Sequence, residues 1–382
     1  GKEIYLVMGK EFSLSPKKVV AIVFGGVSTE HDVSIVSAAS IAENIDRSLF
    51  EPIYVAIEKK GMWFIGPGAF DLLRKKSRHD VDRVVLSIDP EKKGFISVDK
   101  GNTLTPVDVV FPALHGPMGE DGTIQGLFHL GRIPYVGCDV LASAMANDKD
   151  MTKRILAEKG IPVVPGMCIK RFIWAASKDD IIAEIEKRLT FPVFIKPATM
   201  GSSIGIAKVA KLKDIRGAIE EAFKFSDKVL AEKAINDPIE IEVAVLGNDE
   251  PKASAPGRII PGNEFYDFDA KYIDTTSELI IPAKVDTVIS DKIRGLAVDA
   301  FIAIGGKGLA RVDFLVSGDT CYVNEINTMP GFTSISMYPK LWEKTGIPYT
   351  ELITSLIGLA LESAQETESL IKTIDLEKGL DL

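Results

Sequence analysis

The chain has 382 residues, of which 46% are hydrophobic and 26% charged, enough for two or three domains that each bury a core. A net charge of −9 and a pI of about 5.2 argue against a general nucleic-acid binder, which needs a basic surface. Cys138, Cys168 and Cys321 lack metal-ligand spacing, and we find neither an apolar run of about 18 residues nor a signal peptide. We therefore expect a soluble, cytoplasmic protein with reduced thiols and no membrane span.

The N-terminal third alternates strands and helices. After a loose extension at residues 1–17, segment 17–45 predicts a buried strand, a Gly-Gly turn and a helix whose start, Thr29 to Asp32, fits a capping box. Residues 51–65 predict a second strand, and residues 108–137 predict a strand, a glycine-rich loop and a helix. This alternation is typical of an α/β domain with a mostly parallel sheet, in which ligands bind at the loops that follow the strands.

The remaining two thirds read as α+β. Residues 140–166 predict a helical segment that stops at Gly-Ile-Pro, and 191–209 predict a strand, a Gly-Ser loop and a strand. A helix from Leu212 to Phe223 follows. Beyond residue 239 we expect further strands, a polar loop at 262–279, helices near 288–304 and 349–363, and a hairpin between these helices. The stretch "EFYDFDAKYI" in the polar loop is aromatic and charged, which suggests a lid that closes over a site.

The hairpin at residues 310–327 carries one polar face. Because side chains alternate along a strand, one face of its first strand holds Val312, Phe314 and Val316 and the other holds Arg311 and Asp313. On the return strand, we assign Tyr322 and Ile326 to one face and Glu325 and Asn327 to the opposite face. The register that pairs apolar residues sets Asp313 opposite Glu325 and Arg311 opposite Asn327.

Opposed carboxylates about 5 Å apart at Cβ repel each other unless a cation lies between them. The Asp313 and Glu325 carboxylates, with the Asn327 amide oxygen, are hard ligands suited to Mg²⁺. An ordinary half-solvated hairpin explains the same polar face, and the hairpin alone does not decide. The loop that follows, "NTMPGFTSIS", can bring backbone N–H groups close to a ligand.

Other polar residues each have two interpretations. Lys196 precedes a loop of small residues and can hold a phosphate, although a plain hairpin turn explains that loop as well. Lys149 can be an ordinary surface lysine. Glu232 and Glu240 can contact a nucleoside or can be solvated acids. The loop "HGPMGEDG" holds His115 with Glu120, and Glu30 lies in the loop after the first buried strand.

The motifs "GGVSTEHDVS", "LHGPMGEDGTIQG", "KPATMGSSIG", "YDFDAKY", "RVDF" and "NEINTMPGFTSIS" occur in the order found in one family. From about residue 18 to about 363, the chain resembles the D-alanine:D-alanine ligases of the ATP-grasp superfamily. The resemblance implies a three-domain ATP-grasp fold with an N-terminal parallel-sheet domain at 18–137. A central subdomain at 138–232 and a C-terminal subdomain at 233–366, with an omega-loop lid and the metal site, would grip ATP between them.

The resemblance also implies roles for individual residues. Asp313, Glu325 and Asn327 would bind Mg²⁺ or Mn²⁺, and Arg311 with the backbone N–H of Gly331 would stabilise an oxyanion. The implied nucleotide contacts are Lys149, Lys196, Glu232, Lys233, Glu240 and Lys271, although the segment with Glu232 and Glu240 is one residue longer than in some relatives. Glu30, Ser202 and Tyr272 would form a hydrogen-bonded group that holds the first D-alanine and the lid. His115 would lie near that substrate, and Ser336 with Met337 would bind the second D-alanine.

The function implied is ATP-dependent formation of D-alanyl-D-alanine through a D-alanyl phosphate, for peptidoglycan precursor synthesis. The partners implied are D-alanine, ATP and a second copy of the chain in a homodimer. A D-alanine:D-lactate ligase, another carboxylate–amine ligase and a non-catalytic nucleotide-binding protein are the alternatives. Tyr272 favours dipeptide formation, since depsipeptide-forming relatives often carry phenylalanine there. Phe268 and Thr199-Met200 depart from many relatives and could alter the behaviour of the lid.

Overall fold

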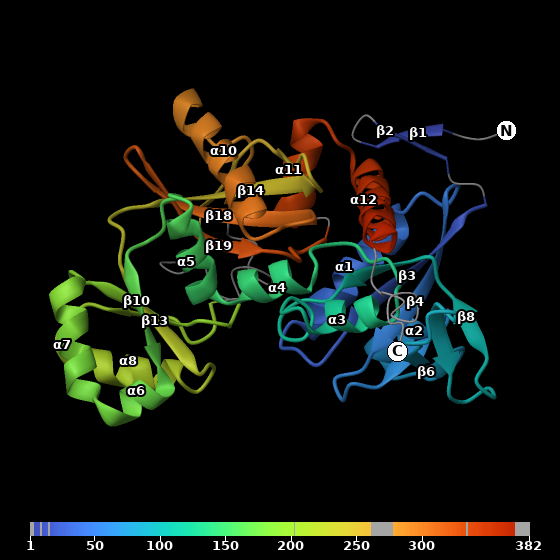
Figure 1. The fold of residues 1–382 in the computed structure, drawn as a ribbon, viewed down its shortest axis with the longest axis horizontal. Helices are drawn as coiled ribbons and strands as arrows, with labels where there is room; N and C mark the ends of the chain where they lie inside the picture. The colour runs from blue at the N-terminus through green and yellow to red at the C-terminus, as the bar shows by residue number, and fades with distance from the viewer. Residues whose placement is uncertain are drawn as a thin grey trace, which may run out of the picture.

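The computed structural model describes residues 4–7, 10–13, 16–201, 203–260, 278–333 and 335–370. Within these residues the strands form three larger sheets and one short hairpin (Figure 1). The hairpin pairs β1 (Ile4–Val7) with β2 (Lys10–Ser13) in antiparallel register, where the sequence predicted only a loose extension.

The N-terminal sheet has the strand order β8-β7-β6-β5-β4-β3-β9. Its strands are β3 (Lys18–Gly25), β4 (Phe50–Ile57), β5 (Trp63–Ile65), β6 (Asp82–Leu86), β7 (Gly94–Ser97), β8 (Leu104–Pro106) and β9 (Val109–Ala113). Its parallel centre, β4-β3-β9, confirms the prediction, and Val20 to Phe24 are fully buried, as expected for a strand covered on both faces. The other pairs are antiparallel, so the prediction of a mostly parallel sheet is wrong.

The antiparallel part begins because residues 51–65 form a hairpin and not a single strand. β4 ends at Ile57, β5 begins at Trp63, and the two are antiparallel neighbours. In the turn between them Gly61 has φ +84°, a backbone conformation that favours glycine. The Glu58 N–H donates to the Met62 carbonyl at 2.9 Å and closes the turn. The segment "EKKG" is therefore a turn signal inside a stretch otherwise typical of a strand.

Helix α1 (His31–Asn44) follows β3 without the predicted capping box. Glu30 is the N-cap, but its side chain makes no capping hydrogen bond. Instead, the backbone N–H of Glu30 donates to Ser28 Oγ at 3.0 Å. The capping-box prediction is wrong, and the Glu30 carboxylate is directed to the site described below. The other helices of this region are α2 (Ala69–Lys75) and α3 (Thr123–Leu130).

The central sheet has the order β10-β13-β11-β12. Its elements are β10 (Gly166–Lys170), α6 (Arg171–Ala176), α7 (Lys178–Arg188), β11 (Val193–Pro197), β12 (Ala207–Val209), a 3₁₀ turn η1 (Leu212–Asp214), α8 (Ile215–Ala222) and β13 (Lys228–Lys233). The helices cover one face of this sheet through a core that includes Ile185, Ile195, Ile219 and Val229. The opposite face of the sheet lines the cavity that is described below.

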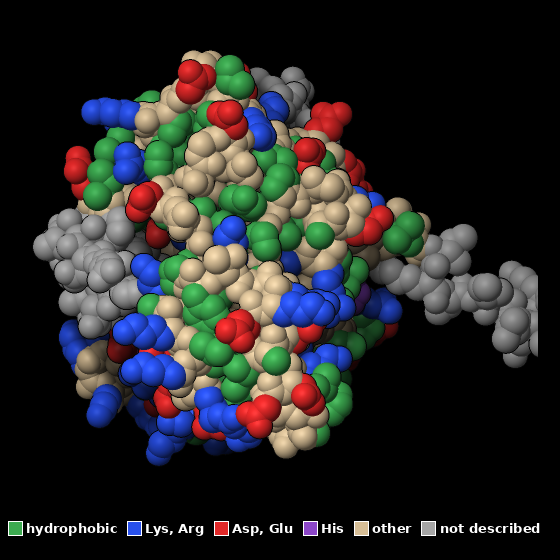
Figure 2. All heavy atoms as spheres, turned by 90° about the vertical axis from the view of Figure 1, so that its left-hand side faces the viewer, with side chains coloured by type: hydrophobic (Ala, Val, Ile, Leu, Met, Phe, Trp, Pro, Cys, Tyr) green, Lys and Arg blue, Asp and Glu red, His purple; other side chains and the backbone are tan. Residues whose placement is uncertain are grey.

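Figure 2 views the molecule from the side on which this central sheet and its helices lie in Figure 1. Lys and Arg side chains are prominent on the lower part of that view. Ion pairs join several of them to carboxylates on neighbouring helices, including Lys178 to Glu220 at 2.7 Å and Arg216 to Asp179 at 2.5 Å. Part of the positive charge on this face is therefore balanced locally.

The C-terminal sheet has the order β17-β16-β14-β18-β19, with β15 beside β14. Its strands are β14 (Ile239–Gly247), β15 (Lys252–Ala253), β16 (Gly257–Ile260), β17 (Glu278–Ile280), β18 (Gly308–Ser317) and β19 (Thr320–Asn327). Helix α10 (Thr287–Ala303) shares a buried core with this sheet through Ile293 and Phe301. The helical segment predicted before the central sheet is confirmed, with a break at Asp148 between α4 (Val140–Asn147) and α5 (Lys149–Glu158).

The β18–β19 hairpin has the predicted register, with Asp313 opposite Glu325 and Arg311 opposite Asn327. A β-bulge then shifts the pairing, so that Phe314 faces Val323 and Leu315 faces Tyr322. Val323 and Ile326 therefore share the buried core, while Tyr322 does not. Assigning Tyr322 to the face of Ile326 is wrong, because the extra residue of the bulge reverses the alternation.

Helices α11 (Met337–Thr345) and α12 (Tyr349–Ser369) end the described chain. α12 packs beside α1 in Figure 1, and its Leu352 and Leu356 belong to the same buried core as Phe24 and Ile41. The C-terminal helix thus holds the N-terminal domain against the C-terminal sheet. No helix among the described residues combines the length and apolar character needed to cross a membrane.

Candidate active site

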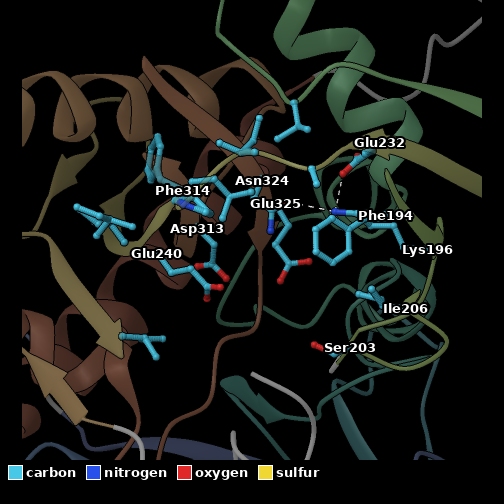
Figure 3. A pocket seen from close by; sticks show the side chains of 18 of the residues that line it. Phe194, Lys196, Ser203, Ile206, Glu232, Glu240, Asp313, Phe314, Asn324 and Glu325 are labelled. Carbon is cyan, nitrogen blue, oxygen red and sulfur yellow. Dashed lines mark hydrogen bonds and ion pairs between the residues drawn. The ribbon is translucent and has the colours of Figure 1, made fainter. Parts of the chain in front are cut away.

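A cavity of about 710 Å³ lies between the central and C-terminal sheets (Figure 3). It is lined by many of the residues that the sequence singled out: Lys149, Lys196, Glu232, Lys233, Glu240, Asp313 and Glu325. These residues come from α5 and from strands of both sheets, so the fold gathers side chains that lie far apart in the sequence.

Strand pairing in the central sheet aims Lys196 and Glu232 into this cavity. Phe194 lies directly opposite Glu232 across β11 and β13, and Lys196 is two residues further along β11 on the same face. Their neighbours Ile195 and Ala231 point to the helix-covered core and are fully buried. In Figure 3, Phe194, Lys196 and Glu232 accordingly project together from one side of the cavity.

Glu232 is 2% exposed and pairs with a lysine through each of its oxygens. Lys196 Nζ lies 2.5 Å from Oε2, and Lys153 Nζ lies 2.8 Å from Oε1. Burial alone would raise the pKa of the Glu232 carboxyl, but Lys196 and Lys153 outweigh burial and lower that pKa to about 2. Lys196 also donates to Asn324 Oδ1 at 3.3 Å, which links it to the hairpin.

Lys149 begins α5 and also lines the cavity. Its backbone N–H donates to the Ala198 carbonyl at 2.9 Å, which ties the start of the helix to the end of β11. Its ammonium group donates to the Met200 carbonyl at 2.8 Å and lies 3.3 Å from Glu325 Oε2. Lys149 and Lys196 therefore present two ammonium groups from different elements near the hairpin carboxylates.

The hairpin oxygens fit a hard divalent cation by their chemistry. Asp313 and Glu325 face each other across β18 and β19 and line the cavity, and Asn327 Nδ2 donates to Asp313 Oδ2 at 3.2 Å. Two carboxylates and an amide are ligands that Mg²⁺ accepts. Within the described residues, no group of three or more His, Cys, Asp or Glu side chains is arranged to hold a metal. An ion here would therefore need the Asn327 amide or non-protein oxygens in addition to the two carboxylates.

Arg311 lies beside Asp313 and Asn327 in a buried network of acids. It donates to both oxygens of Asp313, at 2.7 and 2.6 Å, and its Nε lies 2.9 Å from Glu242 Oε2. Glu242 lies directly opposite Asp313 across β14 and β18, which explains why both acids reach one guanidinium. Burial alone would lower the pKa of Arg311, but Asp313 and Glu242 raise it well above its ordinary value, so the group stays charged.

A second polar cluster lies where the N-terminal domain meets the loop after β19. His115 is buried and joins the two, since its Nε2 lies 2.9 Å from Ser37 Oγ and its Nδ1 lies 3.1 Å from the Met329 carbonyl. Burial lowers the pKa of His115, whereas burial and the Glu30 carboxylate raise the pKa of the adjacent Glu120 to about 8. Burial therefore disfavours the charged forms of both His115 and Glu120 in this cluster.

The loop after β19 connects this cluster with α11. The Phe332 N–H approaches Ser37 Oγ at 3.4 Å, and the Thr333 N–H donates to Ser336 Oγ at 3.0 Å. A Cβ built on Gly331 would lie 2.9 Å from Ser336 Oγ, so the backbone there is close to the hydroxyl. Ser336 is the N-cap of α11, and Met337 is its first residue. The loop therefore brings Gly331 close to Ser336 and the start of α11 at Met337.

Comparisons with known proteins agree with this geometry. Residues 19–138 match a family model described as the D-Ala D-Ala ligase N-terminus, and residues 155–358 match the corresponding C-terminus. A D-alanine–D-alanine ligase from Heliobacterium modesticaldum is 47% identical over 92% of this chain and 97% of its own length. The chain belongs to the D-alanine–D-alanine ligase family.

Solved structures of this ligase family share the fold. The D-alanine–D-alanine ligase from Coxiella burnetii has a TM-score of 0.83 at 34% identity, covering 94% of this chain and 98% of that one. The VanG D-Ala:D-Ser ligase from Enterococcus faecalis has a TM-score of 0.82 at 37% identity, covering 90% of this chain and 99% of that one. The predicted family and the predicted three-domain ATP-grasp fold class are therefore confirmed.

Three predicted residues of the ligase site, Ser202, Lys271 and Tyr272, lie outside the described residues. Ser203, the neighbour of Ser202, lines the cavity. The positions of the other predicted residues follow from the geometry above, while their chemical roles stay predictions.

Sequence reasoning missed three residues of the ligase site: Lys153, Glu242 and Ser37. Lys153 follows Lys149 by four residues, a spacing that places both on one face of a helix. Glu242 follows Glu240 by two residues, which places both on one face of a strand. These two signals were present in the sequence. Ser37 carried no such signal, because only the three-dimensional fold brings it to His115.

Proposed function

We propose that the chain is an ATP-dependent ligase that joins two D-alanines into D-alanyl-D-alanine for peptidoglycan precursor synthesis, acting in the cytoplasm as a homodimer. One observation carries the proposal beyond family membership. A single cavity between two sheets combines two lysine ammonium groups, Lys149 and Lys196, with the opposed carboxylates Asp313 and Glu325. This combination suits a polyphosphate bound together with a divalent cation. We also propose the domain boundaries 18–137, 138–232 and 233–366, of which the last falls one residue before the end of β13 at Lys233.

Asp313, Glu325 and Asn327 would hold Mg²⁺ or Mn²⁺, which when bound neutralises charge on the ATP phosphates. Lys149 and Lys196, which line the same cavity, would add positive charge beside the phosphates. Glu240 on β14 and Lys233 at the end of β13 are the proposed nucleoside contacts. Lys271 is proposed to contact the γ-phosphate from the lid.

In the first step, a carboxylate oxygen of one D-alanine attacks the γ-phosphorus of ATP and ADP leaves. Glu30 is proposed to hold the ammonium group of this D-alanine, with Ser202 and Tyr272 completing the group and His115 beside it. The product of this step is an acyl phosphate, which water must not reach.

In the second step, the amine of the other D-alanine attacks the acyl carbon, a tetrahedral intermediate forms, and phosphate leaves. Arg311 and the Gly331 N–H are proposed to stabilise its oxyanion, the kind of interaction that is usually the largest contribution to acyl-transfer catalysis. Ser336 and the start of α11 at Met337 are proposed to bind the carboxylate of the second D-alanine, because helix N-termini favour anions.

The choice of second substrate is tested by product analysis. The chain is incubated with ATP, Mg²⁺ and D-alanine, alone or with excess D-lactate or D-serine, and the products are identified by mass. We expect D-alanyl-D-alanine to dominate in every mixture. A dominant D-alanyl-D-lactate product would replace the proposed function with the depsipeptide ligase.

A further inference from the structure

Tyr349, the first residue of α12, has no role in the mechanism above, yet it holds the peptide next to Gly331. Its hydroxyl donates to the Phe332 carbonyl at 2.6 Å, and Ser40 Oγ on α1 lies 3.1 Å from the same hydroxyl. The rings of Tyr349 and Phe332 pack with their centroids 5.8 Å apart. Burial raises the pKa of Tyr349, so the hydroxyl keeps the proton that it donates.

The N-terminal domain holds the same loop three residues earlier. His115 Nδ1 lies 3.1 Å from the Met329 carbonyl. The Gly331 N–H therefore lies between two backbone carbonyls, those of residues 329 and 332, that each have a side-chain partner. This N–H donates no hydrogen bond to any other residue that the structure describes, which leaves it available to an oxyanion.

The glycine at this position makes such support necessary. A Cβ on Gly331 would lie 2.9 Å from Ser336 Oγ, so a larger residue is disfavoured. Glycine, however, has the widest choice of backbone conformations and cannot fix the direction of its own N–H. That direction therefore depends on the hydrogen bonds that hold the neighbouring peptides.

We propose that Tyr349 is a positioning residue that fixes the direction of the Gly331 N–H and thereby speeds the second step of the reaction. This inference rests on the proposed function, because it assumes that this N–H stabilises the oxyanion of the tetrahedral intermediate. Loss of an oxyanion donor lowers turnover by about 10²–10³-fold. A donor that is present but loosely held should lower the rate of that step less, by roughly tenfold.

The test separates the two chemical steps in the full chain, supplied with Mg²⁺, D-alanine and ATP that carries ¹⁸O in the oxygen bridging its β- and γ-phosphorus atoms. Reversal of the first step moves the label to a nonbridging β-oxygen of ATP. The rate of this exchange divided by the rate of dipeptide formation measures how the acyl phosphate partitions. In Tyr349→Phe we expect this ratio to rise roughly tenfold, because only the second step is slowed. KM for ATP should stay within about twofold of wild type.

Two further variants separate positioning from a purely structural connection. Ser40→Ala removes the bond to α1 but keeps the bond from Tyr349 to the Phe332 carbonyl, so we expect its ratio to stay within about twofold of wild type. If Tyr349 serves only to join α1 and α12, Ser40→Ala and Tyr349→Phe should behave alike. Tyr54→Phe removes a hydroxyl that accepts from Arg47 at 3.1 Å, and this matched control should leave the ratio unchanged.

Each outcome decides the matter. A ratio that rises in Tyr349→Phe and not in Ser40→Ala supports the proposal. An unchanged ratio in Tyr349→Phe overturns it, as does an equal rise in both variants. Should Tyr349→Phe fail to fold, as judged by its thermal unfolding, Tyr349→Met fills the space with a flexible side chain that cannot donate, and the same rise is expected. A wild-type chain that forms no D-alanyl-D-alanine would instead refute the proposed function.

Discussion

Replacing Arg311 by alanine tests the buried acid network most severely. The guanidinium forms two hydrogen bonds to Asp313, at 2.7 and 2.6 Å, and an ion pair with Glu242 at 2.9 Å. The side chains of all three residues are at most 14% exposed, so water compensates little for the lost partner. In Arg311→Ala the two carboxylates would face each other across β14 and β18 without a cation.

The size of the effect follows from this geometry. Directly opposed residues have Cβ atoms about 5 Å apart, where two like charges repel by about 3 kcal/mol at an effective dielectric constant near 20. Breaking a buried pair by removing one partner costs about 3–5 kcal/mol. We therefore expect the free energy of unfolding of Arg311→Ala to fall by about 3–5 kcal/mol in urea titrations. Turnover should fall by about 10²-fold or more, as for loss of an oxyanion donor, while KM for ATP stays within about threefold.

The matched control is Arg188→Ala, which removes an exposed arginine paired with Glu184 on α7. Its free energy of unfolding should change by less than about 1 kcal/mol, and its turnover should not change. Near-normal turnover in folded Arg311→Ala would refute the oxyanion role. Unchanged stability would show that Asp313 and Glu242 do not depend on the guanidinium.

Three further predictions concern the two polar clusters. In Gly116→Ala, where φ is +77° and the added Cβ would lie 2.8 Å from Glu30 Oε2, the methyl group should displace the Glu30 carboxylate. We expect KM for D-alanine to rise by about tenfold in steady-state kinetics, and an unchanged KM would contradict this prediction. Ser37→Ala removes the 2.9 Å partner of buried His115 and should lower the free energy of unfolding by about 1–3 kcal/mol, whereas no change in urea titrations would contradict that bond. The pKa of Glu232 is lowered from 4.5 to about 2 in the folded chain. Between these two pH values the unfolded chain therefore binds more protons at Glu232 than the folded chain does. Stability supplied by Glu232, on the order of 3 kcal/mol, should be present above about pH 4.5 and be lost as the pH falls toward 2; a stability difference between wild type and Glu232→Gln that does not change with pH would contradict this.

The sequence predicted the parts of the site that follow from local periodicity. Alternation along β18 and β19 gave the faces of Arg311 and Asp313 and the pairing of Asp313 with Glu325, and the structure has that register. The prediction failed one step further, at Tyr322. A bulge inserts one residue into β19. The alternation of polar and apolar residues in a single sequence does not show where such an insertion occurs.

The structure also differs from the sequence predictions at places where two local sequence patterns overlap within a few residues. The turn around Gly61 is only five residues long, from Glu58 to Met62, so the surrounding strand pattern concealed the hairpin and the antiparallel part of the sheet. At α1, the spacing of Thr29 and Asp32 matched a capping box, yet Glu30 is the N-cap and its backbone N–H donates to Ser28 Oγ. Local patterns show which bonds are possible, and tertiary packing selects among them.

Long-range pairing explains what the sequence did not give. Glu242 meets Arg311, and Ser37 meets His115, through contacts between segments separated by 69 and 78 positions. No local spacing encodes such contacts. The family resemblance supplied the predicted site residues of the ligase. The structure added Glu242 and Ser37, which contact the predicted residues Arg311 and His115.

The most direct test of the proposed reaction follows the oxygen atoms. The full chain is incubated with ATP, Mg²⁺ and D-alanine labelled with ¹⁸O in its carboxylate, and dipeptide and inorganic phosphate are analysed by mass. Attack of that carboxylate on ATP, followed by attack of the second amine, predicts one D-alanyl-D-alanine per ADP and a single ¹⁸O in each phosphate released. Phosphate without the label, or ADP formed without D-alanyl-D-alanine, would contradict the account.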